Sequence, residues 1–316
     1  MLKTPVAFVI FNRPEYASRV FEQIRKAKPT LLLVIADGPR ESHPTDQKQC
    51  ALSRAIIDQV DWDCEVRKCY SDVNLGCGRR VSSGLTWIFE QVEEAIILED
   101  DCIPDLTFFQ FCEELLERYR RDERVSQIGG VNYQFGKGKR DYSYYFSRYH
   151  YVWGWATWRR AWKGYDFKVK LWPELRDQGR LRDLFGDKGV VRYYTMNLDQ
   201  TYRGDIDTWD FQWFFHCWIN HRLSVLPSVN LVSNIGYHQV HATHTKMGSP
   251  MSDVSMEPMA FPLSHPPFMV RDLIADKYNG ALFRLSSLSH LYLKMLYLKQ
   301  KITEKLKRSA CGMGER

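Results

Sequence analysis

The residue types best suited to chemistry are three consecutive carboxylates, Glu99, Asp100 and Asp101, which directly follow the apolar run at 95–98. Adjacent carboxylates repel one another unless a cation or hydrogen-bond donors offset their charge. Carboxylate oxygens are the ligands that hard divalent ions such as Mn²⁺ and Mg²⁺ prefer, often together with substrate phosphates. The triplet therefore predicts a divalent metal and a nucleotide diphosphate at one site, although a strand end followed by a helix N-cap would also place Asp there.

Two further polar segments also follow apolar runs. Asn12 and Arg13 come after the run at 5–11, and Asp37 ends the run at 31–37. Helical stripes of apolar residues alternate with these runs, which predicts an α/β fold with a mostly parallel, Rossmann-like sheet flanked by helices. Ligands of such sheets bind at the carboxyl ends of the strands, so we expect the three polar segments to be neighbours in space.

The composition is that of a folded protein large enough to bury a full core, with 316 residues, 44% hydrophobic and 26% charged. The eight cysteines are scattered without the spacing of structural zinc, and we interpret them as reduced thiols of a cytoplasmic protein. We also expect no signal peptide and no membrane-spanning segment, because no apolar run has the required length.

The net charge of +6 is concentrated near the C-terminal end. Residues 284–316 hold eight Lys or Arg and two Glu, a net +6, so residues 1–283 carry no net charge. This distribution argues against a nucleic-acid groove across the body and predicts one basic segment that meets an anionic surface. Apolar and basic residues alternate from 282 to 306, as in an amphipathic helix that lies on an anionic membrane, packs on the domain or pairs with a second subunit.

The glycine motifs that bind phosphate in other nucleotide folds are missing. The turn after the first apolar run is FNRPEY, without a glycine, so we exclude NAD and FAD binding of the G-x-G-x-x-G type. The sequence G-x-x-x-x-G-K-[ST] is also missing, which excludes P-loop chemistry.

Aromatic residues dominate the second half of the chain, where residues 142–218 contain eight of the ten tryptophans. Most of these rings are expected in the core. Sugars present C–H faces that aromatic rings cover well, so we expect one or two of them, Trp155 among the candidates, to line a ligand site. We expect this half to complete one site with the first half.

Several motifs in combination resemble the GT-A glycosyltransferases, namely Ala36-Asp37-Gly38, NLGCGRRVSSGL at 74–85 and IILEDD at 96–101. The chain looks like the inverting, nucleotide-sugar-dependent members that are family-2-like. The E-D-D form with PDLTFFQFC behind it is similar to the N-acetylglucosaminyltransferase I branch. The resemblance extends to about residue 235, and one departure is that Cys77 and Arg79 stand where small residues are usual.

The resemblance implies a role for each matching residue. Asp101 would bind the metal, Mn²⁺ or Mg²⁺, with Asp100 near the ribose and Glu99 near the donor sugar. The other residues implied in nucleotide-sugar binding are Asn12, Arg13 and Asp37 at the uracil and ribose, and Arg79 or Arg80 at the edge of the nucleotide site. His244 would be an additional metal or diphosphate ligand, although a hydrogen-bonded surface histidine is the commoner role.

Transfer of a sugar also needs a base to take the proton of the acceptor hydroxyl. In the resembling enzymes a tryptophan- and aspartate-rich segment downstream of a Gly-Trp loop supplies it, and Asp210 in TWDFQW matches that position. Asp207 is the second candidate for the base. The alternative for Asp210 is a helix cap among core aromatics.

These observations predict a GT-A domain over 1–268, with a nucleotide-sugar-binding half at 1–130 and an acceptor and catalytic half at 131–268, then a basic amphipathic helical tail at 269–316. The expected protein is cytoplasmic, peripheral on the inner membrane face, and transfers a sugar from a UDP-sugar to a glycan or glycolipid of a bacterial surface polysaccharide or lipopolysaccharide. A sugar-nucleotide nucleotidyltransferase and a non-enzymatic carbohydrate-binding or scaffold protein are the alternatives, but the first would need a glycine-rich basic loop after the first strand.

Overall fold

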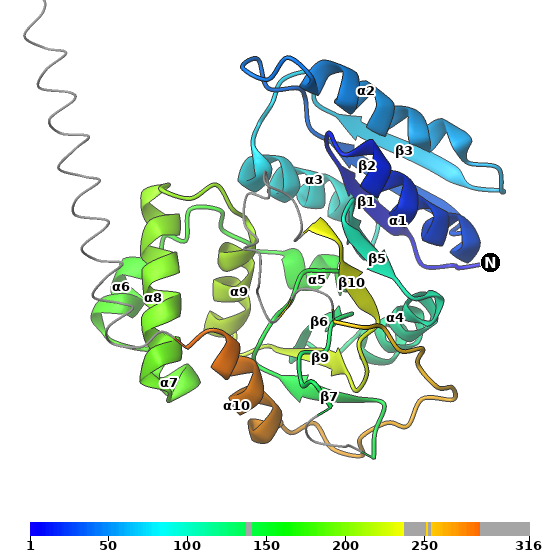
Figure 1. The fold of residues 1–316 in the computed structure, drawn as a ribbon. Helices are drawn as coiled ribbons and strands as arrows, with labels where there is room; N and C mark the ends of the chain where they lie inside the picture. Colours follow the sequence, from blue (N-terminus) through cyan, green and yellow to red (C-terminus); the bar gives the residue numbers. More distant parts are fainter. Residues whose placement is uncertain (137–140, 237–250, 252–253, 285–316) are drawn as a thin grey trace, which may run out of the picture.

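The computed structural model describes residues 1–136, 141–236, 251 and 254–284. Its central element is an eight-stranded sheet with the strand order β3-β2-β1-β4-β8-β6-β9-β7 (Figure 1). The strands of this sheet are β1 (Val6–Ile10), β2 (Leu31–Ala36), β3 (Glu65–Tyr70), β4 (Glu94–Glu99), β6 (Val125–Gly129), β7 (Tyr144–Ser147), β8 (Trp155–Trp158) and β9 (Leu223–Pro227). A two-stranded sheet pairs β5 (Cys102–Pro104) with β10 (Val232–Asn234).

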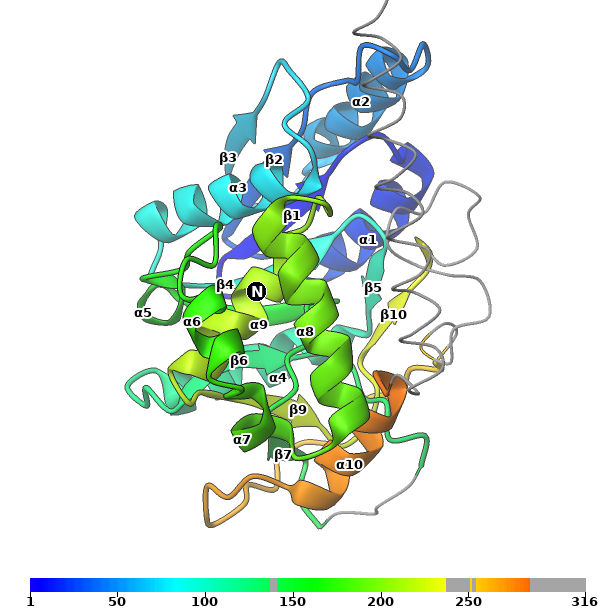
Figure 2. The same ribbon diagram turned by 90° about the vertical axis from the view of Figure 1, so that its left-hand side faces the viewer.

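Helices flank both faces of the main sheet, which confirms the expected α/β, Rossmann-like class. Figure 2 shows α1 and α2 on one side of β1 to β4 and α3 and α5 on the other. The helices are α1 (Pro14–Ala27), α2 (Asp46–Ala55), η1 (Ile56–Gln59), α3 (Cys77–Gln91), α4 (Leu106–Tyr119), α5 (Arg159–Trp162), α6 (Trp172–Asp177), α7 (Leu181–Phe185), α8 (Lys188–Arg203), α9 (Asp210–Ile219) and α10 (Leu273–Leu282).

The first four strands run parallel, and three of them, β1, β2 and β4, have apolar sequences that suit burial on both faces, whereas the edge strand β3 is partly exposed. Every residue of β1 is buried, as are five of the six residues of β2. β1 pairs in parallel with β2 on one side and β4 on the other, so the carboxyl ends of these strands lie at one edge. The apolar residues Ala17, Val20, Phe21 and Ile24 recur at helical spacing and form the buried face of α1. Burial of such a stripe is the main source of stability for a helix of this length.

The second half of the chain continues the same sheet. β8 pairs antiparallel with β4 on one side and with β6 on the other, so it lies between strands that precede it in the chain. Its residues are all buried, and Trp155 and Trp158 are among the largest fully buried side chains. β8 thus joins strands of both halves of the chain in one sheet, while the division into 1–130, 131–268 and a tail at 269–316 stays a prediction.

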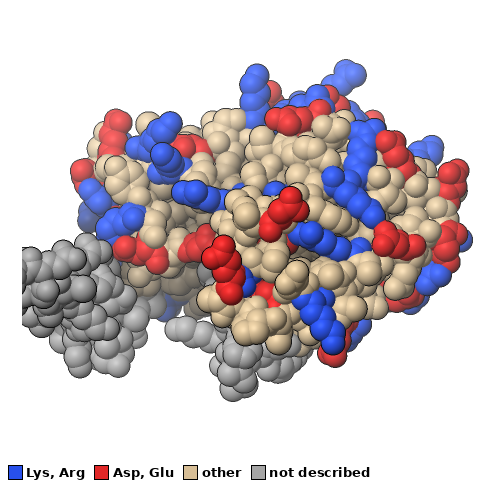
Figure 3. Space-filling view, turned by 90° about the horizontal axis from the view of Figure 1, so that it is seen from above, with Lys and Arg blue, Asp and Glu red and all other residues tan. Residues whose placement is uncertain are grey.

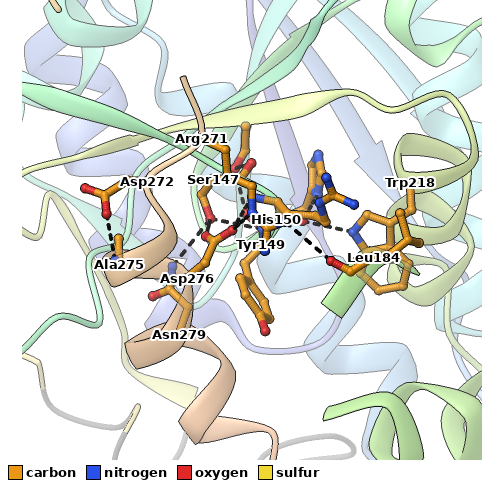
Figure 4. Close-up of polar contacts among 12 residues, drawn as sticks. Ser147, Tyr149, His150, Leu184, Trp218, Arg271, Asp272, Ala275, Asp276 and Asn279 are labelled. Carbon is orange, nitrogen blue, oxygen red and sulfur yellow. Dashed lines mark hydrogen bonds and ion pairs between the residues drawn. The ribbon is translucent and has the colours of Figure 1, made fainter. Parts of the chain in front are cut away.

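The segment after residue 268 begins with packed structure. Asp276 of α10 is buried and accepts hydrogen bonds from Ser147 Oγ and, at 3.2 Å, from the backbone N–H of Arg148, and it pairs with Arg271 (Figure 4). The inner face of α10 therefore packs on β7. The predicted amphipathic helix from 282 to 306 lies almost wholly outside the described residues.

The surface charge of the described part is mixed. Seen from above, Lys and Arg are interspersed with Asp and Glu (Figure 3), as expected for a body without net charge. Within the described ranges, every helix is too short or too polar to cross a membrane.

Candidate functional site

The acidic triplet and the β1 turn meet at the carboxyl edge of the sheet. β1 and β4 pair in register from Val6 with Ile96 to Val9 with Glu99, so the residues after each strand are neighbours. The guanidinium of Arg13 pairs with both acids, donating to Asp101 Oδ2 at 2.9 Å and to the carboxylate of Asp100. The structure thus brings Arg13, Asp100 and Asp101 into direct contact, and Glu99 directly precedes them.

Burial and mutual repulsion set the charges of this cluster. Burial raises the pKa of Glu99, and the negative charges of Asp101 and Asp100 raise it further. Burial also raises the pKa of Asp100, although the charge of Arg13 opposes this effect. Burial acts to lower the pKa of Arg13, but the two carboxylates outweigh it and the pKa is raised. Arg13 therefore stays charged and offsets part of the negative charge.

Asp101 also contacts the second sheet, which the sequence did not reveal. Its Oδ1 lies 3.4 Å from Nδ2 of Asn234, and its backbone carbonyl accepts a hydrogen bond from Ile235 at 2.8 Å. The pairing of β5 with β10 places Asn234 opposite Cys102 and so beside Asp101. Asn234 is the functional candidate that sequence reasoning missed, because a lone Asn after a short strand carries no local signal of a partner 133 residues away.

Asp37 at the end of β2 holds the loop before α3. Its two carboxylate oxygens accept hydrogen bonds from the backbone N–H groups of Gly38, Leu75 and Gly76 and from Nδ2 of Asn74, at 2.9 to 3.2 Å. Burial raises the pKa of Asp37, and the hydrogen bonds oppose that rise. The structure thus shows a role for Asp37 in shaping the loop, and its contact with a uracil stays a prediction.

Asn12 is engaged in a separate buried contact. Its Nδ2 donates to Asp46 Oδ1 at 2.8 Å, and Arg40 pairs with the other oxygen of Asp46 at 2.6 Å. The hydrogen bonds and charge of Arg40, with the bond from Asn12, lower the pKa of Asp46 to about 2. Asp46 was not expected from the sequence, since Thr45-Asp46 has the composition of an ordinary helix start.

Asp210 begins α9 and lies within electrostatic reach of the acidic triplet. Its negative charge is one of the causes that raise the pKa of Glu99, and it acts on Cys77 in the same way. Asp210 Oδ1 accepts hydrogen bonds from Thr208 Oγ1 and from the N–H of Phe211. Among the described residues none donates to Oδ2, so this oxygen is available as a proton acceptor.

The other aspartate of this turn, Asp207, has a different partner. Its Oδ1 accepts a hydrogen bond of 2.9 Å from the backbone N–H of Gly78 in the first turn of α3. The two candidate bases therefore differ in their hydrogen-bond partners. Asp207 accepts a hydrogen bond from the distant helix α3, whereas Asp210 accepts hydrogen bonds from Thr208 and Phe211 of its own turn.

The remaining expected residues fall in three different places. Trp155 is fully buried and its ring stacks on Trp209 at a centroid distance of 5.7 Å, so it exposes no surface to a ligand. Arg79 is exposed to solvent, whereas Arg80 is buried and donates to the backbone carbonyl of Cys69 at 2.7 Å. His244 lies outside the described residues.

The carboxylate oxygens of this cluster are suitable ligands for a divalent ion that also coordinates a substrate phosphate. The carboxylate of the half-buried Glu99 accepts no hydrogen bond from any described residue, and the carboxylate of the adjacent Asp101 offers oxygen ligands of the kind that hard ions prefer. No group of three or more His, Cys, Asp or Glu in the described ranges is arranged to hold a metal alone. Ions such as Mg²⁺ commonly bind through one or two carboxylates and complete their coordination with water and substrate phosphates. Asp101 would be the protein ligand of such an ion.

Comparison with known proteins finds no matching family model and no matching curated protein. Solved structures show partial similarity. A mannosyltransferase from Pyrobaculum calidifontis, in complex with GDP-Man and Mn²⁺, is 12% identical with a TM-score of 0.36 over 51% of this chain and 46% of that chain. A UDP-glucose pyrophosphorylase complexed with UDP-glucose is 11% identical, with a TM-score of 0.26 over 46% of this chain and 62% of that chain.

A 4-diphosphocytidyl-2C-methyl-D-erythritol synthase from Anaerococcus prevotii is 12% identical, with a TM-score of 0.34 over 59% of this chain and 84% of that chain. This chain spans less than two thirds of the length of the mannosyltransferase and of the pyrophosphorylase. Similarity of this strength carries no function from one protein to another, so we base the function on the geometry of the site.

Proposed function

We propose that this protein is a metal-dependent, inverting glycosyltransferase that uses a nucleotide diphosphate sugar as donor. The observation that carries the proposal is the acidic triplet with Arg13 bound to it at the carboxyl edge of a parallel sheet, while Asp210 at the start of α9 is near enough for its charge to act on Glu99 and raise the pKa of that carboxylate. This is the edge at which α/β sheets bind nucleotides. The triplet and Arg13 are suited to bind a divalent cation and a diphosphate, and Asp210 is suited to accept a proton.

The chemistry assigned to the chain is a single displacement. The acceptor oxygen attacks the anomeric carbon, the bond from that carbon to the diphosphate oxygen breaks, and the nucleotide diphosphate leaves. The hydroxyl proton passes to Oδ2 of Asp210. When bound, a divalent ion would neutralise charge on the leaving diphosphate. Arg13 supplies fixed positive charge beside the same group.

The finer assignments rest on the sequence resemblance. We propose UDP as the nucleotide, a glycan or lipid-linked glycan of a bacterial surface polysaccharide as the acceptor, and kinship with the N-acetylglucosaminyltransferase I branch. Glu99 and Asp100 would face the donor sugar and ribose, and Arg79 the nucleotide. The lack of a glycine in the β1 turn is what favours transfer over nucleotidyl transfer.

Thermal unfolding in the presence of nucleotides tests the donor site. We expect one of UDP, GDP, TDP and CMP to raise the melting temperature in a Mn²⁺-dependent way, because a ligand present at a hundred times its Kd stabilises the native state by about 2.7 kcal/mol. Asp101→Asn should abolish the part that needs Mn²⁺, whereas Asp63→Asn, at an exposed position, should not. No shift with any nucleotide would overturn the proposal.

Product analysis separates the reaction classes. A glycosyltransferase releases the nucleotide diphosphate when an acceptor glycan is added to a nucleotide sugar. A nucleotidyltransferase instead releases pyrophosphate from a nucleoside triphosphate and a sugar 1-phosphate, and a binding protein releases neither. Asp210→Asn should abolish release of nucleotide diphosphate and leave the thermal shift by the donor nucleotide intact.

We also propose that the basic tail brings the protein to an anionic membrane surface. The support is the charge of +6 carried by 284–316 against a body with none. The full-length protein should co-sediment with phosphatidylserine vesicles at low salt and not with phosphatidylcholine vesicles. Changing Lys299, Lys301, Lys305 and Lys307 together to Gln should abolish this binding, and binding to both vesicle types alike would contradict an electrostatic mechanism.

A further inference from the structure

The loop that leads into α3 is held on two sides by carboxylates from other parts of the chain. On one side, Asp37, which directly follows β2, accepts hydrogen bonds from the N–H groups of Leu75 and Gly76. On the other side, Asp207 accepts the hydrogen bond from the N–H of Gly78. Asp37 belongs to the first half of the molecule, and Asp207 to the turn between α8 and α9. The loop therefore connects the nucleotide edge of the sheet to the turn that carries Asp210.

Asp207 supplies a cap that α3 lacks. Gly76 occupies the N-cap position and has no side chain to accept a hydrogen bond, and no acidic residue lies in the first turn of the helix. The free N–H groups and the positive end of the helix dipole favour a carboxylate at that point. Asp207 provides this carboxylate from a position 129 residues later in the chain.

The close approach of the two segments depends on glycine. A Cβ at Gly76 would lie 2.5 Å from Oδ2 of Asp207, and a Cβ at Gly78 would lie 2.7 Å from its Oδ1 and 2.6 Å from the carbonyl oxygen of Thr208. The backbone of Gly76 also has a φ of +81°, which residues other than glycine rarely adopt. The sequence G-C-G thus fits the turn before α9.

The contact continues directly to the proposed base. Thr208 follows Asp207, and its hydroxyl donates to the same oxygen of Asp210 that accepts from Phe211. With Oδ1 held by these two donors, Oδ2 is the oxygen left for the acceptor hydroxyl. Displacement of Asp207 would therefore displace the turn that orients Asp210.

We infer that Asp207 is a positioning residue that fixes the Asp210 turn against the loop before α3, and that it is not itself the base. This inference rests on the proposed function for its catalytic consequence, whereas the contact with Gly78 is independent of any activity. Because the carboxylate acts as a hydrogen-bond acceptor, an amide oxygen can replace it. A base cannot be replaced in this way, since an amide does not take up a proton at neutral pH.

The test compares Asp207→Asn, Asp207→Ala and Asp210→Asn in the full-length protein. Asp207→Asn should keep kcat within about threefold of the parent, whereas Asp207→Ala should lower kcat by about a hundredfold, the scale of loss seen when reacting groups are slightly misplaced. Nucleotide binding measured by thermal shift should be the same in Asp207→Asn, Asp210→Asn and the parent. If Asp207→Asn loses as much activity as Asp210→Asn, Asp207 is a base and the inference is wrong.

Hydrogen exchange supplies a readout that does not need turnover. Amides of residues 76–82 should exchange faster in Asp207→Ala and at the parental rate in Asp207→Asn, because only the alanine variant loses the acceptor. Unchanged exchange in the alanine variant would overturn the inference even if the enzyme is active. An inactive parent would instead refute the proposed function while leaving the contact to be decided by exchange. If Asp207→Ala does not fold, the pair Asp207→Asn and Asp210→Asn still separates the two roles.

Discussion

At the scale of single residues, the partner of each aspartate determines what it can do. Asp37 accepts several hydrogen bonds from one loop, and Asp207 caps a helix of another segment. Asp100 and Asp101 share one arginine, which keeps a dense negative cluster tolerable. Asp210 accepts hydrogen bonds through Oδ1 from Thr208 and Phe211 of its own turn, and its Oδ2 has no donor among the described residues. Aspartates of one chain thus differ in role, whether structural, electrostatic or proposed as catalytic, and the contacts of each one decide its role.

Replacing Asp37 by asparagine should destabilise the fold even without nucleotide. The amide group would face donors that now bond a carboxylate oxygen, and an unsatisfied buried donor costs about 1–3 kcal/mol. Urea unfolding should therefore show a lower free energy of unfolding by that amount. Asp63→Asn, at an exposed position, should change it little. Equal stability of Asp37→Asn and the parent would mean that the loop is held by other contacts.

Because His150 is buried, the free energy of unfolding should fall as the pH drops below about 6.5. It is fully enclosed, with Nε2 2.9 Å from Ser126 Oγ and Nδ1 3.1 Å from the Arg148 carbonyl, and burial lowers its pKa to about 3. The unfolded chain takes up a proton near pH 6.5, so stability is full above about pH 6.5 and is progressively lost as the pH falls toward the folded pKa. His150→Gln should reduce the difference in melting temperature between about pH 7 and about pH 5. His43→Gln, at an exposed position, should leave that difference unchanged.

At the scale of elements, local sequence patterns predicted the strands well but did not predict which distant residues contact one another. The apolar runs at 5–11, 31–37 and 95–98 became β1, β2 and β4 because continuous burial on both faces leaves a clear pattern. Contacts between Asp207 and Gly78 or between Asn12 and Asp46 leave none, since they depend on how distant segments pack. That the residues after β1, β2 and β4 lie at one edge of the sheet was predictable from the strand ends, whereas their hydrogen bonds were not.

The packing of α10 was also not predictable from local sequence. The sequence pattern predicted a helical tail from residue 269, whereas Asp276 of α10 is buried against Ser147 of β7 and pairs with Arg271. Removal of its buried carboxylate by Asp276→Ala would leave Arg271 without its partner, and breaking a buried pair in this way costs about 3–5 kcal/mol. Amide exchange in 271–284 should rise more than in β1 and β4. Lys277→Ala, on the exposed face of the same helix, is the matched control and should leave exchange unchanged.

At the scale of the whole molecule, the continuous sheet should make the two halves unfold together. Trp155 of β8 pairs with Ile97 of β4 and with Gly129 of β6, so neither half has a complete sheet without the other. Tryptophan fluorescence reports mainly on 142–218, which hold eight of the ten tryptophans, while far-ultraviolet circular dichroism reports on both halves. The two signals should give one coincident transition. Separate transitions would show that the halves are independent domains.

The strand order also bears on how the chain can fold while it is being synthesised. β8 fills the place between β4 and β6, yet both of those strands leave the ribosome before it does. Until residue 158 has emerged, the apolar β4 has an unpaired edge, and such edges invite association with other chains. The nascent protein therefore has a vulnerable interval in which chaperone binding would matter most, and it ends when the strand bearing Trp155 and Trp158 is inserted.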